Sequence, residues 1–219
     1  MKVQAVNFRQ YTPHFSANYS KENNVAILGS SKYTGTEVTW DAMDQAARIA
    51  RSIVLSGKNV ITGCGSDGVM GAAYTSAAEH STKDENGRPE QNVVILKRPF
   101  WGDEDFTNCT IFGSEKTEAA RIERFIETAD SFIIFPGGPG TLQEATTLIS
   151  NNYYNKENAK KIYLVGSEYF EGLDSQYWDM YMQKLIDCTP DELYTIVDHV
   201  YEITEQIISP ASDLAFKDK

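Results

Sequence analysis

The sequence predicts an α/β fold, a single Rossmann-like domain in which a doubly wound parallel sheet is flanked by helices. Short apolar runs alternate along the chain with stretches of helical periodicity. The runs are hydrophobic at nearly every position, which is typical of parallel strands buried on both faces. Turns of small residues follow three of these runs, at 29–31, 63–71 and 136–140. Because the carboxyl ends of parallel strands share one edge of the sheet, these turns are expected to meet at one crevice.

The runs and periodic stretches also give the order of the elements. We expect strands over residues 24–28, 59–62, 92–96, 109–112, 131–135, 161–165 and 194–197. We expect helices over residues 39–56, 72–79, 114–129, 142–152, 178–186 and 200–208. Thr39 or Asp41 is the expected cap of the first helix, and Ser114 that of the third. Residues 1–23 are predicted to form an N-terminal arm, 24–208 the nucleotide-binding domain and 209–219 a flexible tail.

Composition narrows the class of protein. A chain of 219 residues suits one α/β domain, and its net charge of -11 opposes binding to nucleic acid. No apolar run is long enough to span a membrane, and the N-terminus lacks the apolar core of a signal peptide, so we expect a cytoplasmic protein. The three cysteines and three histidines are scattered, which favours neither a disulfide framework nor a metal site. No metal or redox cofactor is expected.

The stretch from Pro136 to Glu144 carries the clearest chemistry. Its glycines join a buried strand to a helix, so that uncovered backbone N–H groups and the positive end of the helix dipole are expected to bind a phosphate. Thr141 either caps this helix or donates its hydroxyl to the same anion. Glu144 follows on the same side, one turn into the helix. The alternatives are a simple tight turn and an ordinary first-turn acid.

A second glycine turn has the spacing Gly63-x-Gly65-x-x-Gly68, which fits dinucleotide binding after a strand. No carboxylate follows about twenty residues later at a strand end, so a nicotinamide cofactor is not expected. The turn is either a ligand contact or only a tight turn. Further on, Phe100 and Trp101 either stack on a planar base or plug the core.

These motifs resemble those of the Lonely Guy (LOG) family of nucleoside 5′-monophosphate phosphoribohydrolases, long labelled lysine decarboxylases. The residues Pro136-Gly137-Gly138-Pro139-Gly140-Thr141-Leu142-Gln143-Glu144 match the family signature PGGxGTxxE. Gly29-Ser30-Ser31 is similar to the family's first turn, and residues 63–71 to its GGGxxGxMG. The resemblance covers nearly the whole chain beyond about residue 24. The same superfamily includes nucleotide sensors and molybdenum-cofactor carriers, which are the alternative function.

The resemblance implies hydrolysis of AMP or an N6-modified, cytokinin-type AMP to the free base and ribose 5-phosphate, by a homodimer. Glu144 and Arg121 are the implied catalytic residues. The implied phosphate- or nucleotide-binding residues are Gly29, Ser30, Ser31, Gly65, Ser66, Pro136, Gly137, Gly138, Gly140 and Thr141. Glycosidic cleavage builds positive charge on the sugar, which a carboxylate at Glu144 stabilises. The chain has Ile122 where the family has a lysine, and Arg124 one turn further on is the alternative cation.

Overall fold

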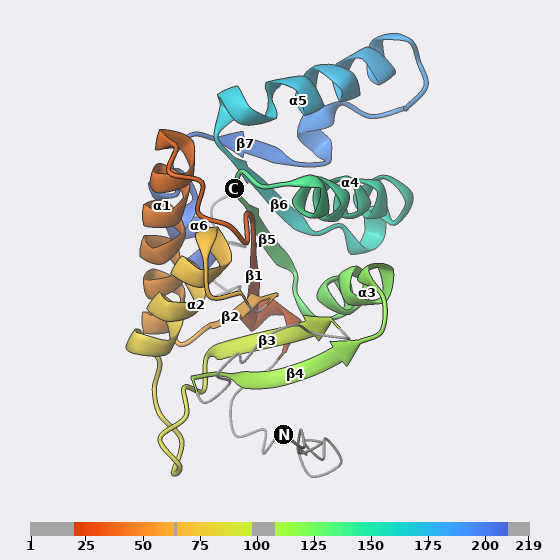
Figure 1. The fold of residues 1–219 in the computed structure, drawn as a ribbon. Helices are drawn as coiled ribbons and strands as arrows, with labels where there is room; N and C mark the ends of the chain where they lie inside the picture. The colour runs from red at the N-terminus through yellow and green to blue at the C-terminus, as the bar shows by residue number, and fades with distance from the viewer. Residues whose placement is uncertain (1–19, 64, 98–107, 210–219) are drawn as a thin grey trace.

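The structure, a computed structural model, describes residues 20–63, 65–97 and 108–209. Within these residues, seven parallel strands form one sheet in the order β4-β3-β2-β1-β5-β6-β7 (Figure 1). This confirms the predicted doubly wound α/β fold. Cys64, Phe100 and Trp101 lie outside the described residues, as do most of the predicted arm and tail.

The strand predictions hold closely. The strands are β1 (Asn24–Leu28), β2 (Asn59–Thr62), β3 (Asn92–Lys97), β4 (Thr110–Glu115), β5 (Ser131–Ile134), β6 (Lys161–Val165) and β7 (Thr195–Val197). The bounds of β1, β2 and β6 agree with the prediction to the residue, because each is a short, mainly apolar run that ends directly before a glycine. β4 extends to Glu115, so that Ser114 lies in a strand and does not cap a helix.

The helix predictions are less accurate. The helices are α1 (Glu37–Leu55), α2 (Gly68–His80), α3 (Glu118–Thr128), α4 (Pro139–Tyr154), α5 (Ser167–Met182) and α6 (Tyr201–Ile208). The predicted caps of α1 and α3 were wrong: Thr36 accepts from the backbone N–H of Thr39, and Thr117 from that of Ala120. Several residues able to cap stand near each start, so composition alone did not choose between them.

Helix α5 differs most from its prediction, since it begins at Ser167 and not at 178. Phe170 is its one fully buried side chain among the described residues, so the first half of the helix shows no apolar stripe in the sequence. Gly166, with φ of 105°, turns the chain from β6 into the helix in a backbone conformation that glycine adopts without strain.

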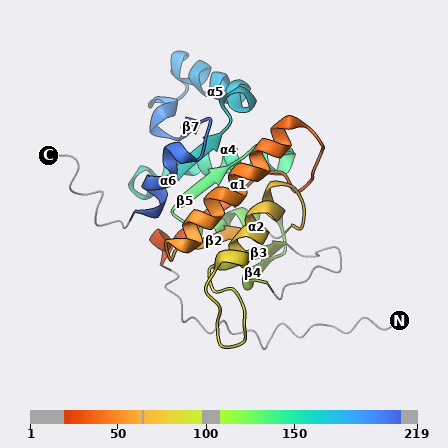
Figure 2. The ribbon, with the colours of Figure 1, turned by 90° about the vertical axis from the view of Figure 1, so that its left-hand side faces the viewer.

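Alternating residues of β1 supply two cores. Val25 and Ile27 pack with helices α1, α2 and α6 on one face, which Figure 2 shows in front of the sheet. Ala26 and Leu28 pack with α3, α4 and α5 on the other face. β1 pairs with both β2 and β5. The later strands are added on both sides: β2, β3 and β4 on one side of β1, and β5, β6 and β7 on the other. The carboxyl ends of β1 and β5 are therefore the switch point where doubly wound sheets bind ligands.

In the part of the chain that the structure describes, no helix is long and apolar enough to cross a bilayer.

The Asn152 side chain connects α4 to the segments that lead into β6 and β7. Its amide donates to the carbonyls of Lys160 and Leu193, both at 2.8 Å, and its carbonyl accepts from the N–H of Lys160 at 2.7 Å. The side chain is 2% exposed. Loss of these bonds leaves buried backbone groups unpaired.

We therefore expect Asn152→Ala to lower the free energy of unfolding by about 3 kcal/mol. Urea denaturation measures this change. The control is Asn151→Ala on the same helix, whose side-chain contact is with exposed Asn155, and which is expected to change stability by about 0.5 kcal/mol or less. Equal effects of the two substitutions would show that the buried bonds do not stabilise α4.

Candidate functional site

A cavity of about 310 Å³ opens where β1, β2 and β5 end, between the starts of α3 and α4. Eight residues singled out from the sequence line it: Gly29, Ser30, Ser31, Arg121, Gly138, Gly140, Thr141 and Glu144. Four further residues line it that sequence reasoning missed: Lys32, Met70, Glu118 and Pro139. Residues of four separate segments, 29–32, 70, 118–121 and 138–144, thus meet at this edge of the sheet.

The start of α4 presents free backbone donors to this cavity. Gly138 is the cap, and the first N–H to bond back to it is that of Leu142, at 3.1 Å. The N–H groups of Gly140 and Thr141 precede that bond and have no acceptor within the helix. No atom lies within 4 Å of where a Cβ on Gly138 or Gly140 would stand. An anion can approach this backbone closely.

Thr141 does not cap the helix, because α4 begins at Pro139 and Thr141 is its third residue. Its side chain is buried against the preceding turn: a Cβ on Gly137 would lie 2.2 Å from the Thr141 hydroxyl oxygen. Position 137 therefore requires glycine for close packing and leaves the hydroxyl at the cavity wall.

Hydrogen bonds brace the three turns against one another. The N–H of Ser30 donates to the carbonyl of Pro136 at 3.1 Å, and the N–H of Met70 donates to the carbonyl of Ser30 at 3.3 Å. From α5, the hydroxyl of Tyr169 donates to the carbonyl of Gly137, and the N–H of Gly137 lies 3.4 Å from the same hydroxyl oxygen. The turn at residues 136–138 is thus held by the turn after β1 on one side and by Tyr169 of α5 on the other.

Arg121 enters the cavity from α3 with its guanidinium fixed by three partners. It donates to the carbonyl of Gly63 at 2.8 Å, to the carbonyl of Ile95 at 3.2 Å, and to the carboxylate of Glu118 at 2.9 Å. These bonds use one donor on each nitrogen, so that one N–H on each terminal nitrogen remains for a ligand. The side chain needs the space that glycine leaves at position 63, since a Cβ there would lie 1.6 Å from a terminal nitrogen.

Glu144 is buried in the cavity wall, with 6% of its surface exposed. Burial raises the pKa of its carboxyl to about 7; Arg121 acts in the opposite direction, and the charge of Glu118 raises the pKa further. Glu144 is therefore about half protonated at neutral pH. A carboxyl in this range can accept or donate a proton during a reaction.

The remaining sequence-derived residues lie outside the cavity lining. Gly65 lies beside it, since a Cβ there would meet the Met70 methyl at 3.3 Å, and Ser66 lines a separate hollow beside α2. Pro136 lines a second cavity, and Gly137 is in the lining of neither cavity. Cys64 is not described.

Neither position 122 nor position 124 on α3 supplies a cation to the cavity. Ile122 is 2% exposed and packed in the interior, so the family's lysine position does not face the cavity in this chain. Arg124 pairs with Glu115 and Glu127, both at 3.0 Å, and does not line the cavity. Lys32 is the second cationic residue in the described lining of the cavity. Its signal was its position, directly after the small-residue turn that follows β1.

Among known proteins, the family model described as "Possible lysine decarboxylase" matches residues 68–207. The pyrimidine/purine nucleotide 5′-monophosphate nucleosidase of Escherichia coli strain K12 is 29% identical over an alignment of 140 residues, which covers 59% of this chain and 30% of that enzyme. This chain thus matches less than a third of its relative's length. The nucleosidase of strain O157:H7 matches to the same extent.

Solved structures share the fold at lower identity. The molybdenum cofactor carrier protein of Chlamydomonas reinhardtii superposes with a TM-score of 0.52 at 15% identity, over 84% of this chain and 96% of that one. The molybdenum cofactor binding protein of Rippkaea orientalis gives a TM-score of 0.50 at 18% identity, over 85% of this chain and 96% of that one. At these identities the likeness concerns the fold alone.

The raised pKa of Glu144 predicts a pH-dependent stability. The folded protein holds this proton more tightly than the unfolded chain, so Glu144 costs no stability below its ordinary pKa of 4.5. The cost grows as pH rises from there to about 7. We expect Glu144→Gln to match the unsubstituted protein at pH 4 and to exceed its free energy of unfolding by about 3 kcal/mol at pH 8. Denaturation across this pH range measures the difference. The control is Glu123→Gln, at an exposed position on α3, which should give no such trend.

Position 63 gives a second prediction. Because a methyl group at this position overlaps the Arg121 guanidinium, Gly63→Ala is expected to displace that cation and so raise the pKa of Glu144. Carbon-detected NMR titration of the Glu144 carboxyl measures the shift. Gly172→Ala is the control, since open space surrounds that position on α5. An unchanged Glu144 pKa in Gly63→Ala would contradict the expected coupling.

Proposed function

Because the chain belongs to the family described as possible lysine decarboxylases, the LOG family, we propose that it is a nucleoside 5′-monophosphate phosphoribohydrolase. Its expected substrate is AMP or an N6-modified AMP of the cytokinin type, and its products are the free base and ribose 5-phosphate. The observation that carries this proposal is the buried Glu144 carboxyl, one helical turn inside an open anion-binding helix start and next to Arg121.

The phosphate group is assigned to the start of α4. The N–H groups of Gly140 and Thr141 have no acceptor within the helix, and the helix dipole adds positive potential. Lys32 adds a full charge, while the charge of Arg121 is largely balanced by Glu118. The site is thus locally suited to an anion although the chain carries -11 overall.

The ribose is assigned to Glu144. In the proposed reaction, water adds to the anomeric carbon as the bond to the base nitrogen breaks, and the base leaves with that electron pair and takes up a proton. Positive charge grows on the sugar before water bonds fully, and an ionised Glu144 stabilises this charge and accepts the proton of the attacking water. The remaining N–H groups of Arg121 bind the phosphate or the departing base.

A binding protein of the same fold is the second candidate. Ile122 at the family's lysine position favours it, because the family's cation is absent there and the side chain is buried away from the cavity. Such a protein is expected to hold a nucleotide or a pterin without cleaving it. Lys32 favours the enzyme, because it lines the same cavity from another loop.

The test is incubation of the purified protein with AMP, N6-modified AMP and the other common nucleoside monophosphates. Chromatography is expected to show the free base and ribose 5-phosphate. Glu144→Gln should lower kcat by about 10²- to 10⁴-fold. For the unsubstituted protein, kcat/KM should rise with pH through about 7, since the ionised form of Glu144 acts.

Arg121→Ala and Arg124→Ala form a matched pair on α3. Arg121 lines the cavity and Arg124 does not. Arg121→Ala is therefore expected to lose activity, and Arg124→Ala is expected to keep it. Tight binding of a nucleotide or pterin without release of any base would reject the hydrolase and support the second candidate.

A further inference from the structure

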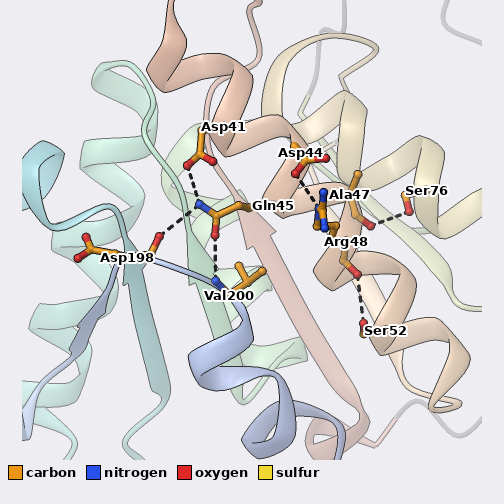
Figure 3. Close-up of polar contacts among 9 residues, drawn as sticks. All are labelled: Asp41, Asp44, Gln45, Ala47, Arg48, Ser52, Ser76, Asp198 and Val200. Atoms are coloured by element: carbon orange, nitrogen blue, oxygen red, sulfur yellow. Dashed lines mark hydrogen bonds and ion pairs between the residues drawn. The ribbon is translucent and has the colours of Figure 1, made fainter.

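A second cavity, of about 650 Å³, lies at the same edge of the sheet and is about twice as large as the site cavity. Helix α1, the start of α5 and the link from β7 to α6 enclose it, whereas α3 and α4 line the first cavity. Figure 3 shows part of its wall, where Gln45 of α1 lies between Asp41 and Asp198. The proposed hydrolysis assigns nothing to this space.

The inner wall is apolar. It is formed by Val38, Ala42, Phe135, Pro136 and Val165. Three of these side chains, Ala42, Phe135 and Val165, are almost completely buried and belong to the core on the α1 face of the sheet. Val38 and Tyr169 are about half exposed and remain open on this wall. A ligand with a flat hydrocarbon body can cover them, and removal of apolar surface from water is a main source of affinity in small-molecule sites.

The polar part of the wall is acidic. Asp41, Glu168 and Asp198 contribute carboxylates, and none of the described residues that line the cavity is a lysine or an arginine. The lining also contains one histidine, His199, whose imidazole ring stacks on the ring of Tyr201 with centroids 5.2 Å apart.

Internal hydrogen bonds fix two of these carboxylates without neutralising them. Asp41 accepts from the Gln45 amide at 2.6 Å, and that amide also bonds the backbone at Asp198 and Val200, as Figure 3 shows. Asp198 accepts from the N–H of Ser167 at 2.9 Å. The bond to Asp41 uses one carboxylate oxygen, and Asp198 also accepts from the side chain of Ser167. Because a carboxylate offers about four acceptor positions, acceptor capacity remains on both groups.

We propose that this second cavity binds a small amphipathic cation, a flat apolar ring that carries an ammonium group. The ring lies against Val38 and Tyr169, and the ammonium lies among the three carboxylates. An anion is disfavoured, because Asp198 already occupies the first N–H of α5 and the surrounding charge is negative. The proposal does not depend on the hydrolase activity.

Three probes with the same ring system test it: tryptamine, a cation; tryptophol, its neutral analogue; and indole-3-acetate, an anion. Each is titrated into the full chain while backbone amide shifts are followed by two-dimensional NMR. Tryptamine is expected to bind about tenfold more tightly than tryptophol, because each partly exposed carboxylate contributes a few-fold in affinity. Indole-3-acetate is expected to bind more weakly than tryptophol. The largest shifts are expected at Val165, Gly166 and Tyr169.

Charge-removing variants give the matched comparison. Asp41→Asn combined with Glu168→Gln should bring tryptamine to within about threefold of tryptophol, and each single substitution should give an intermediate ratio. Asp44→Asn combined with Glu171→Gln removes the same charge from α1 and α5 outside this lining and should keep the tenfold preference. Equal affinities of the cation and its neutral analogue, or tryptamine shifts centred on another surface, would overturn the proposal.

Discussion

The Arg121 guanidinium is the contact on which the site depends. It bonds the carbonyls of Gly63 after β2 and Ile95 in β3, so that one side chain joins two neighbouring strands to α3. The register between β3 and β4 shifts between Val94 and Ile95, which interrupts the ladder next to one of these carbonyls. Lysine has no planar fork that could reproduce this geometry. The cation next to Glu144 is therefore positioned by the sheet as well as by its own helix.

Burial and charge act against each other at Glu144. Removal from water disfavours the carboxylate, Arg121 favours it, and Glu118 weakens that help by pairing with Arg121 and adding its own negative charge. The net result is a carboxyl that titrates near neutrality. Local geometry decides this balance, and the overall charge of the chain has little influence on it.

The sequence predicted the fold because its strands are short apolar runs and its glycine turns stand at their carboxyl ends. It failed at α5, where a single buried phenylalanine gives no periodicity, and at the caps of α1 and α3, where several suitable residues compete. At the site, the glycine signature located the cavity, with Glu144 and Arg121 in its wall. Lys32 was missed although it directly follows the turn after β1, and Glu118 was missed because only the tertiary structure places the start of α3 at the cavity. The pKa of Glu144 was equally inaccessible, since it follows from burial.

The titration of Glu144 near pH 7 links the proposed anion binding to proton uptake. A phosphate that arrives at the start of α4 adds negative charge close to a half-protonated carboxyl and so draws a proton from the solvent onto it. Heat measured for such binding at neutral pH then contains the ionisation enthalpy of the buffer. The apparent binding enthalpy differs between phosphate-free buffers of unequal ionisation heat, even where the contacts between protein and ligand are the same.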